Sequence, residues 1–314
     1  MNPQSSEWSG LRLRVPASTS NLGPGFDFLG LALALFLEVR VESREEVGGP
    51  QLLECTGLAQ DWPRGEENLL LRSLAHGARA LGISVPALRL CVTSQIPMAR
   101  GLGSSGASVA AGLLLAERAA GKPAGESRLL ALGLELEGHP DNSSAALLGG
   151  CTLAVPRGDG TLRVVRAQLS SELGFALAWS EQTLPTRESR AVLPAQVAFG
   201  DAVENPRRLA LLLEGLRTAD AELLALGIED RLHVRYRLPL IRGGAQALEA
   251  ARATGACAAT ISGSGSALVA IAPRERAQAV ADALGAELRR ANGAATACVV
   301  EAVHGAPRFD YSRA

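Results

Sequence analysis

A short segment rich in glycine and serine lies between two apolar runs of the chain. It consists of Pro97, Met98, Ala99, Arg100, Gly101, Leu102, Gly103, Ser104, Ser105 and Gly106. Residues 88–96 before it are typical of a strand, and residues 107–120 after it are typical of a helix. Glycines let the backbone approach a ligand closely, and the free N–H groups at a helix start favour anions. The segment therefore predicts a phosphate-binding loop, and phosphate points to a nucleotide.

Two other phosphate-binding motifs explain this segment less well. The spacing from Gly101 to Gly106 fits G-x-G-x-x-G, but a dinucleotide site also needs an acidic residue about 20 positions later, at a strand end. The acidic residue nearest that distance, Glu126, begins a predicted helix. A Walker loop needs G-K-[ST], and the only lysine of the chain is Lys122, followed by Pro123. Phosphate charge must therefore be met by backbone N–H groups, arginines and a metal ion. A serine-capped turn without a ligand is the remaining alternative.

Three further polar segments are ambiguous when each is taken alone. Residues 16–27 have the sequence PASTSNLGPGFD, whose residue types are ordinary in turns. Residues 135–144, ELEGHPDNSS, place carboxylates, an imidazole and an amide at the end of a predicted helix, which suits a capping turn and a polar site equally well. Residues 260–266, TISGSGS, lie between two predicted strands and are typical of a hairpin turn.

Taken together and in this order, the four segments resemble the GHMP small-molecule kinases, most closely those that act on homoserine. The similarity rests on P-A-S-x-x-N-L-G-P-G-F-D, P-x-x-x-G-L-G-S-S, E-G-H-P-D-N and a late S-G-x-G, and residues 186–194 are also similar. It extends from about Arg14 to Val303. The chain departs from the pattern at Gly106, where alanine is usual, and at Ser266, where proline is usual. Neither change removes a charged or amide group.

The resemblance implies ATP and Mg²⁺ as cofactors. The phosphate-binding loop, from Pro97 to Gly106, would hold the nucleotide through backbone N–H groups. Ser104 or Ser105 would offer a hydroxyl to the metal, and Glu137 would offer the carboxylate oxygen that a hard divalent cation prefers. Glu135 is the alternative. Because two positions on a helix are separated by about 200°, only one of these glutamates can face the metal, and the family motif matches Glu137.

The resemblance also implies L-homoserine as the substrate, with phosphorylation of its side-chain hydroxyl. Asp27 would bind the ammonium group, and Arg190 and Arg237 would bind the carboxylate, which arginine can hold at two points. The groups that would orient the hydroxyl beside the nucleotide are Asn21, His139 and Asp141. Whether Asp141 acts as a general base, or transfer is direct, stays open at this point.

Hydrophobic periodicity predicts an α+β chain of two domains, divided at residue 168 into an N-terminal α/β domain (1–168) and a C-terminal ferredoxin-like domain (169–314). The resemblance implies that the N-terminal domain binds ATP. In the first we expect strands at 11–15, 28–42, 88–96, 147–155 and 161–167, and helices at 66–81, 107–120 and 126–137. In the second we expect strands at 175–179, 256–261, 267–271 and 297–303, and helices at 206–216, 244–253 and 275–291. Strand–helix–strand–strand–helix–strand is the order of a split βαβ domain.

Composition excludes several other classes of protein. The net charge is −1 with no basic stripe, so neither nucleic acid nor a membrane surface is expected as a partner. Five cysteines, far apart, are expected to be reduced thiols, and no secretory signal is visible, so we expect a cytoplasmic protein. Oligomeric state is not readable, and a homodimer is compatible with the sequence. The alternatives are another GHMP kinase, such as one for mevalonate, and a nucleotide-binding regulator without turnover.

Overall fold

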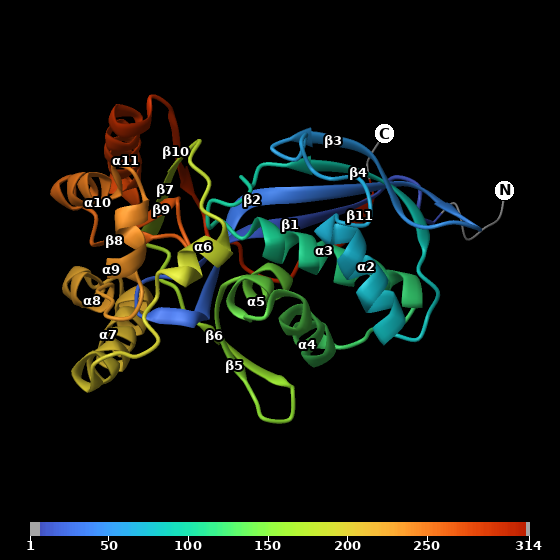
Figure 1. The fold of residues 1–314 in the computed structure, drawn as a ribbon, viewed down its shortest axis with the longest axis horizontal. Helices are drawn as coiled ribbons and strands as arrows, with labels where there is room; N and C mark the ends of the chain where they lie inside the picture. The colour runs from blue at the N-terminus through green and yellow to red at the C-terminus, as the bar shows by residue number, and fades with distance from the viewer. Residues whose placement is uncertain (1–6, 312–314) are drawn as a thin grey trace.

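The computed structural model describes residues 7–311 and contains two sheets with helices packed against them (Figure 1). The first sheet has the strand order β11-β1-β2-β4-β3, and β2 also pairs with β5, which pairs with β6. Its strands are β1 (Leu11–Asn21), β2 (Gly25–Glu45), β3 (Gln51–Gly57), β4 (Ala87–Ser94), β5 (Cys151–Pro156), β6 (Leu162–Ala167) and β11 (Phe309–Tyr311). Only the pair of β3 and β4 is parallel.

Four helices belong to this first half: α2 (Leu69–Ala80), α3 (Ser104–Ala120), α4 (Glu126–Glu137) and α5 (Asp141–Leu148). Helices α3 and α5 pack on β1, and α2 and α4 pack on α3. Because α3 is enclosed by the sheet and by other helices, all its residues from Gly106 to Ala116 are buried. This explains why its sequence is apolar on every side rather than along one stripe.

The second sheet has the antiparallel strand order β10-β7-β9-β8. Its strands are β7 (Leu173–Ser180), β8 (Ala258–Ile261), β9 (Leu268–Pro273) and β10 (Ala295–Val300). The helices of this half are α6 (Thr186–Ala191), α7 (Phe199–Thr218), α8 (Ala221–Gly227), α9 (Val234–Arg237), α10 (Gly244–Ala253) and α11 (Ala277–Asn292), with 3₁₀ turns η1 (Leu238–Leu240) and η2 (Arg274–Arg276). The connections and strand order confirm the predicted ferredoxin-like arrangement.

Alternating side chains of β7 join two hydrophobic cores. Phe175, Leu177 and Trp179 belong to the larger core, which also contains the buried residues of the first sheet and of α7. Ala176 and Ala178 point the other way, into a smaller core with α10 and α11. This period of two is the pattern expected of a strand covered on both faces. The larger core therefore runs without interruption from one sheet to the other.

Several predicted element boundaries were wrong. The segment expected to be one loop from residue 16 to residue 27 is mostly strand, because β1 continues to Asn21 and β2 begins at Gly25. Helix α7 begins at Phe199, and Pro206, which was expected to begin it, lies inside the helix. Residues Leu147 and Leu148, expected in a strand, end helix α5. The elements β3, α5, α6, α8, α9 and β11 were not predicted.

The end of the chain returns to the first sheet. Strand β11 pairs with β1 so that Leu13 faces Phe309, and Ala302 forms a bridge with Leu33 of β2. The expected boundary at residue 168 falls between β6, which belongs to the first sheet, and β7, which belongs to the second. The domain limits themselves stay predictions. Within residues 7–311, no helix is long and apolar enough to cross a membrane.

Candidate active site

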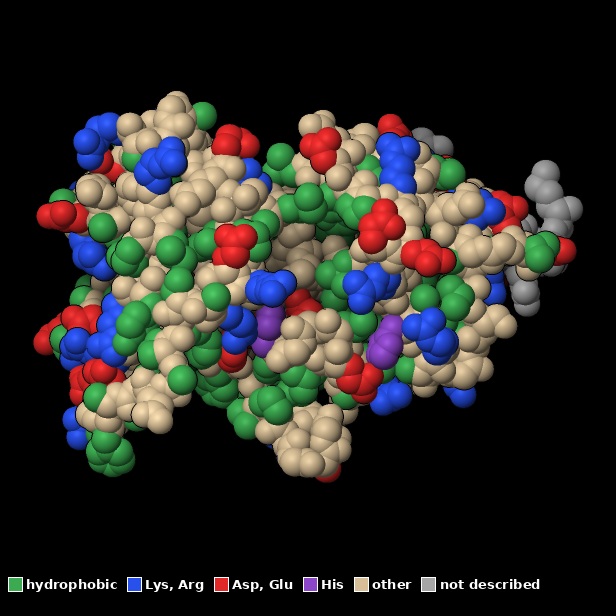
Figure 2. All heavy atoms as spheres, in the orientation of Figure 1, with side chains coloured by type: hydrophobic (Ala, Val, Ile, Leu, Met, Phe, Trp, Pro, Cys, Tyr) green, Lys and Arg blue, Asp and Glu red, His purple; other side chains and the backbone are tan. Residues whose placement is uncertain are grey.

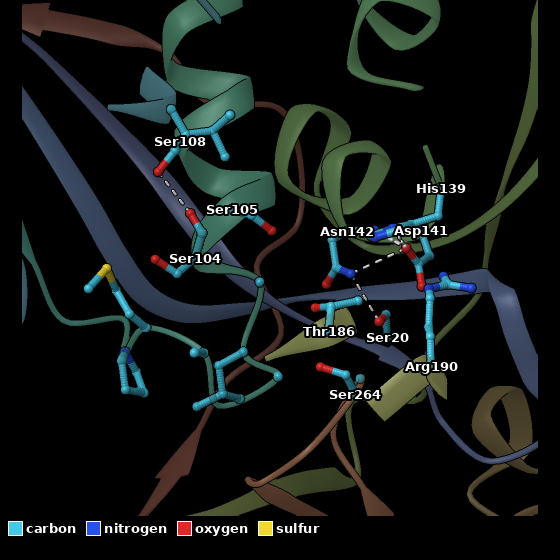
Figure 3. Close-up of a pocket in the computed structure, with 18 of the residues that line it drawn as sticks. Ser20, Ser104, Ser105, Ser108, His139, Asp141, Asn142, Thr186, Arg190 and Ser264 are labelled. Carbon is cyan, nitrogen blue, oxygen red and sulfur yellow. Dashed lines mark hydrogen bonds and ion pairs between the residues drawn. The ribbon is translucent and has the colours of Figure 1, made fainter. Parts of the chain in front are cut away.

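All four polar segments of the sequence meet at one cavity of about 410 Å³ between the two halves of the molecule. Figure 2 shows a hollow there, with charged side chains and an imidazole at its rim. The close-up in Figure 3 shows Ser104 and Ser105 at the start of α3 on one side, and His139, Asp141 and Asn142 on the other. Residues from the second half, including Thr186, Arg190, Arg237, Gly263 and Ser264, complete the lining.

The glycines of the phosphate-binding loop are required by the packing of these segments on one another. Gly101 and Gly103 have positive φ angles of 75° and 69°. A Cβ added at Gly103 would lie 2.0 Å from Ser18 Oγ, and one at Gly101 would lie 2.1 Å from the carbonyl oxygen of Ser262. The loop is therefore pressed between the end of β1 and the late glycine-rich turn. A side chain at Gly103 would disturb this packing as well as any bound phosphate.

Ser105 and Glu137 form a contact between the start of α3 and the end of α4. The Ser105 hydroxyl donates to Glu137 Oε1 at 2.8 Å, whereas Glu137 Oε2 is buried without a hydrogen-bond partner. Burial raises the pKa of Glu137 above its ordinary value, although His139 and Ser105 act to lower it. A buried carboxylate oxygen without a partner, beside a hydroxyl and a phosphate-binding loop, fits a divalent cation.

The other candidate glutamate points elsewhere. Glu135 lies on the outer side of α4 and pairs with His76 of α2, with 2.9 Å between Oε2 and Nε2. Its side chain is about half exposed. The geometry thus favours Glu137 over Glu135 as a metal ligand. Glu137 is itself not among the residues that line the cavity, while Ser104 and Ser105 are.

Asp141 is the centre of a buried hydrogen-bond network. Its Oδ1 lies 2.8 Å from His139 Nδ1 and accepts hydrogen bonds from the backbone N–H and the side-chain amide of Asn142. Asn142 in turn donates to Ser20 Oγ and accepts from Ser18 Oγ. Gly30 of β2 lets this end of α5 approach the sheet, since a Cβ there would lie 2.1 Å from the carbonyl oxygen of Asp141.

This network fixes the charges of His139 and Asp141. Burial acts to lower the pKa of His139, but its hydrogen bond to Asp141 and the charges of Asp141 and Glu137 outweigh burial and raise it. Burial acts to raise the pKa of Asp141, but the bonds from His139 and Asn142 outweigh burial and lower it. Both shifts favour an imidazolium paired with a carboxylate.

Asp27 and Arg190 bind each other in this structure. The two guanidinium nitrogens Nη1 and Nη2 lie 2.9 and 2.6 Å from the two carboxylate oxygens of Asp27. Both residues line the cavity, and each side chain is about one third exposed. Asp27 has a φ of 54°, which is unusual for a residue other than glycine. The pair therefore offers one anion and one cation side by side at the cavity wall.

Arg237 is a buried cation at the same wall. Only 1% of its surface is exposed, and its hydrogen bonds go to the carbonyl oxygens of Ser189 and Gly263 and to His233 Nδ1. Burial, together with the nearby charge of Arg190, lowers the pKa of Arg237 to about 10. Within residues 7–311, Arg237 forms no ion pair with a carboxylate. An anionic group of a ligand would therefore offset the free-energy cost of burying the charge of Arg237.

Two predicted site residues have mainly positioning contacts. Asn21 donates from Nδ2 to the carbonyl oxygen of Gly263 and accepts from the N–H of Asp27 with Oδ1, so it ties the first loop to the late turn. Arg100 is not among the lining residues. Its guanidinium donates to the carbonyl oxygens of Met98, Ser180 and Glu181 at 2.9–3.0 Å, and so holds the phosphate-binding loop against the end of β7.

An apolar end of the cavity was not predicted from the sequence. Trp62, Pro63, Asn68, Leu69 and Met98 line it. Asn68 caps α2 by accepting from the N–H groups of residues 70 and 71, and its amide donates to the carbonyl oxygen of Pro63. The one available signal was Asn68, a residue type preferred at helix N-caps, near the start of the helix predicted over residues 66–81. Nothing in the sequence places Trp62, which is far from the phosphate-binding loop in the chain, at this wall.

Comparison with family models matches both halves of the chain. Residues 68–150 match the GHMP kinases N terminal domain, and residues 212–290 match the GHMP kinases C terminal domain. A homoserine kinase from Moorella thermoacetica is 41% identical over 279 residues, which is 88% of this chain and 92% of that protein. A homoserine kinase from Synechococcus sp. (strain RCC307) is 39% identical over 273 residues, 86% of each chain.

Solved structures agree with these matches. A crystal structure of homoserine kinase from Cytophaga hutchinsonii superposes with a TM-score of 0.84 and 27% identity, covering 96% of this chain and 98% of that one. A mevalonate kinase from L. major in complex with R-mevalonate has a TM-score of 0.68 at 15% identity, covering 94% and 96% of the two chains. The second likeness extends to the fold alone.

Proposed function

Because the chain belongs to the homoserine kinases of the GHMP kinase family, we propose that it transfers the γ-phosphoryl group of ATP to the side-chain hydroxyl of L-homoserine, giving O-phospho-L-homoserine. Threonine biosynthesis is the pathway that this activity serves. The observation that carries the proposal is the single cavity that joins the loop at the start of α3 to a wall of paired and unpaired charges.

The phosphate end of the cavity is built for charge neutralisation. Phosphoryl transfer needs positioned groups and compensation of negative charge more than covalent help from the protein. Backbone N–H groups from Gly101 to Gly106 lie where α3 begins, so the helix dipole adds to their attraction for phosphate. Ser105 and Glu137 would hold Mg²⁺, with Ser104 as the second hydroxyl; when bound, the ion would neutralise part of the phosphate charge. The apolar wall with Trp62 and Met98 suits the nucleotide base.

The opposite wall is suited to a zwitterion. An ammonium group can replace Arg190 beside Asp27, while a carboxylate binds Arg190 and the buried Arg237. The Asp27–Arg190 ion pair is then replaced by two contacts, one between Asp27 and the substrate ammonium and one between the arginines and the substrate carboxylate. No charge is left without a partner. Mevalonate carries a carboxylate but no ammonium. It can therefore pair with an arginine but has no cationic group to pair with Asp27. This asymmetry favours homoserine over mevalonate as the substrate.

His139, Asp141 and Asn21 would orient the reacting hydroxyl. The His139–Asp141 pair is charged and held by Asn142, so it provides a fixed dipole at the cavity rather than a free base. The lowered pKa of Asp141 makes it a weak acceptor of the hydroxyl proton. We therefore favour transfer in which these residues orient the hydroxyl and the proton leaves with the phosphorylated product or through solvent.

The product identifies the reaction directly. The protein is incubated with ATP, Mg²⁺ and L-homoserine, and ³¹P NMR or mass spectrometry should detect a phosphate monoester on the side-chain oxygen. Phosphate on the amino or carboxyl group, or no phosphorylated amino acid, would contradict the proposal. A cytoplasmic location and a homodimer stay predictions.

A further inference from the structure

His233 is a buried residue at the back of the substrate wall that the sequence analysis did not select. Its side chain is fully enclosed. It lies at the start of α9, four residues before Arg237, and its ring is 5.0 Å from that of Phe26. Phe26 directly precedes Asp27 at the start of β2. His233 thus lies between two of the segments that form the proposed homoserine site.

The two ring nitrogens of His233 contact one group from each segment. Nε2 is 2.9 Å from the carbonyl oxygen of Gly23, and Nδ1 is 3.3 Å from Arg237 Nη1. A carbonyl oxygen can only accept, so Nε2 must carry the hydrogen. A guanidinium can only donate, so Nδ1 must be the bare nitrogen. The surroundings therefore specify one neutral tautomer.

The groups around His233 are consistent with the neutral form. Burial lowers its pKa and the charge of Arg237 adds to this, while Asp230 and Asp27 act in the opposite direction. The Oδ2 atom of Asp230 accepts from the N–H groups of Leu232, His233 and Val234. Its buried Oδ1 lies 3.9 Å from His233 Nε2, beyond hydrogen-bond distance, and has no hydrogen-bond partner within residues 7–311. A proton on Nδ1 would place two donors face to face in a buried site.

We propose that His233 is a positioning residue for the amino-acid substrate. Its Nδ1 orients the guanidinium of Arg237 toward the cavity, and its Nε2–H holds the Gly23 turn that leads to Asp27. One side chain thereby sets the distance between the group for the substrate carboxylate and the group for its ammonium. This inference rests on the proposed homoserine kinase activity, and it adds a residue that does not line the cavity.

Two variants separate the two contacts of the ring. In His233→Gln the side-chain amide reaches the position of Nε2 and keeps a donor for Gly23, but Arg237 loses its acceptor. In His233→Asn the amide stays near the position of Nδ1 and keeps an acceptor for Arg237. A hydrogen bond to a charged group affects binding by about tenfold or more when it is lost. We expect His233→Gln to raise the KM for homoserine by about tenfold and the KM for ATP by less than twofold, and His233→Asn to raise the homoserine KM by less than His233→Gln does.

The exposed His304 gives the matched control. It takes part in none of the hydrogen bonds or ion pairs found within residues 7–311. His304→Gln should leave both KM values unchanged. Equal losses for homoserine and ATP in His233→Gln, or an unchanged homoserine KM, would overturn the inference. If the wild-type protein phosphorylates no homoserine at all, the proposed function fails instead, which is a separate result.

A measurement on the unmodified protein covers the case in which the variants do not fold. With ¹⁵N-labelled histidine, NMR should report one histidine with a protonated Nε2 and a bare Nδ1 that stays neutral at pH 6, below the ordinary histidine pKa of about 6.5. Selective assignment through Gly23, whose carbonyl oxygen accepts from Nε2, identifies the signal in the unmodified protein. A charged His233 at pH 6, or the opposite tautomer, would overturn the inference.

Discussion

The carboxylate of Asp27 and the guanidinium of Arg190 form a two-point ion pair in the cavity, although 163 positions separate them in the chain. Asp27 lies at the start of β2, and Arg190 lies in α6 in the second half of the molecule. The pair links the two halves of the molecule at the cavity wall. It also offers both charges that a zwitterionic substrate needs.

Asp27→Asn and Arg190→Gln should each raise the KM for L-homoserine, because each removes a charge that would pair with the substrate. Losing one member of a charged pair costs about 2–5 kcal/mol when the other is left buried, and partial exposure of this pair places the effect near the lower end. The KM for ATP should change little. Steady-state kinetics with each substrate varied in turn measures both values.

The Asp201–Arg235 pair is a matched control for these variants, since it joins an aspartate and an arginine at 2.7 Å outside the lining of the cavity. Asp201→Asn should leave the homoserine KM unchanged. If Asp27→Asn behaves like Asp201→Asn, Asp27 does not bind the ammonium group.

Glu137→Gln should lower kcat by about 10- to 100-fold with little change in the homoserine KM, because it removes a charged metal ligand. Glu135→Gln, on the same helix but paired with His76, should have less than a twofold effect. Titration of Mg²⁺ at saturating ATP gives the second readout, since only Glu137→Gln should raise the concentration that half-saturates the enzyme. The reverse result would assign the metal to Glu135.

The pH dependence of kcat follows from the raised pKa of Glu137. Activity should fall as the pH decreases through a value above the ordinary glutamate pKa of about 4.3, because protonation removes the metal ligand. Mg²⁺ favours the ionised carboxylate, so higher Mg²⁺ concentrations should move this loss of activity to lower pH. An acidic limb that does not move with Mg²⁺ would contradict a metal-binding Glu137.

The His139–Asp141 pair should stabilise the fold in a defined pH window. The pKa of His139 is raised, so its contribution is complete below about pH 6.5 and is lost as the pH rises through the higher folded value. The pKa of Asp141 is lowered, so its contribution is present above about pH 3.9 and is lost as the pH falls through the lower folded value. Thermal melts should therefore show a larger loss of Tm for His139→Gln at pH 6 than at pH 9. The half-exposed pair of His76 and Glu135 gives the control, and His76→Gln should show a smaller effect at both pH values.

Replacing Gly103 by alanine should lower the Tm by more than backbone strain alone would. Gly103 and Gly121 flank the same helix with the same φ of 69°, but a Cβ at Gly121 meets nothing within 4 Å, whereas one at Gly103 meets Ser18. Gly121→Ala thus measures strain, and the additional loss of Tm in Gly103→Ala measures the clash. Adding Ser18→Ala to Gly103→Ala should recover part of the loss. Equal effects of the two glycine variants would contradict the packing described here.

Local patterns predicted those parts of the fold and site that depend on neighbouring residues. The glycine-rich loop before α3 was recognised because the strand, the loop and the helix follow one another in sequence. The same holds for the order of elements in the second sheet. Helix α5 was missed, because its eight residues begin with polar ones that also suit a turn. Strand β3 was missed because only Leu52 and Cys55 of its residues are buried.

Contacts between distant segments were beyond the reach of the sequence. The motifs indicated Asp27 and Arg190 separately, through resemblance, but not that they bind each other. Arg237 was one arginine among many until its burial beside His233 was visible. Trp62 lines the cavity although the sequence did not indicate it. Arg100 was expected to bind the nucleotide, but it does not line the cavity and bonds to backbone carbonyl oxygens.

One assay tests the central claim most directly. ADP release is measured with ATP and Mg²⁺ across L-homoserine, L-serine, L-threonine and mevalonate, with the background ATPase rate subtracted. A cavity that pairs Asp27 with a substrate ammonium and Arg190 and Arg237 with its carboxylate predicts the highest kcat/KM for L-homoserine. A higher value for mevalonate would contradict the substrate while leaving the kinase chemistry intact. No release above background with any of these alcohols would contradict the enzymatic activity and favour a nucleotide-binding regulator.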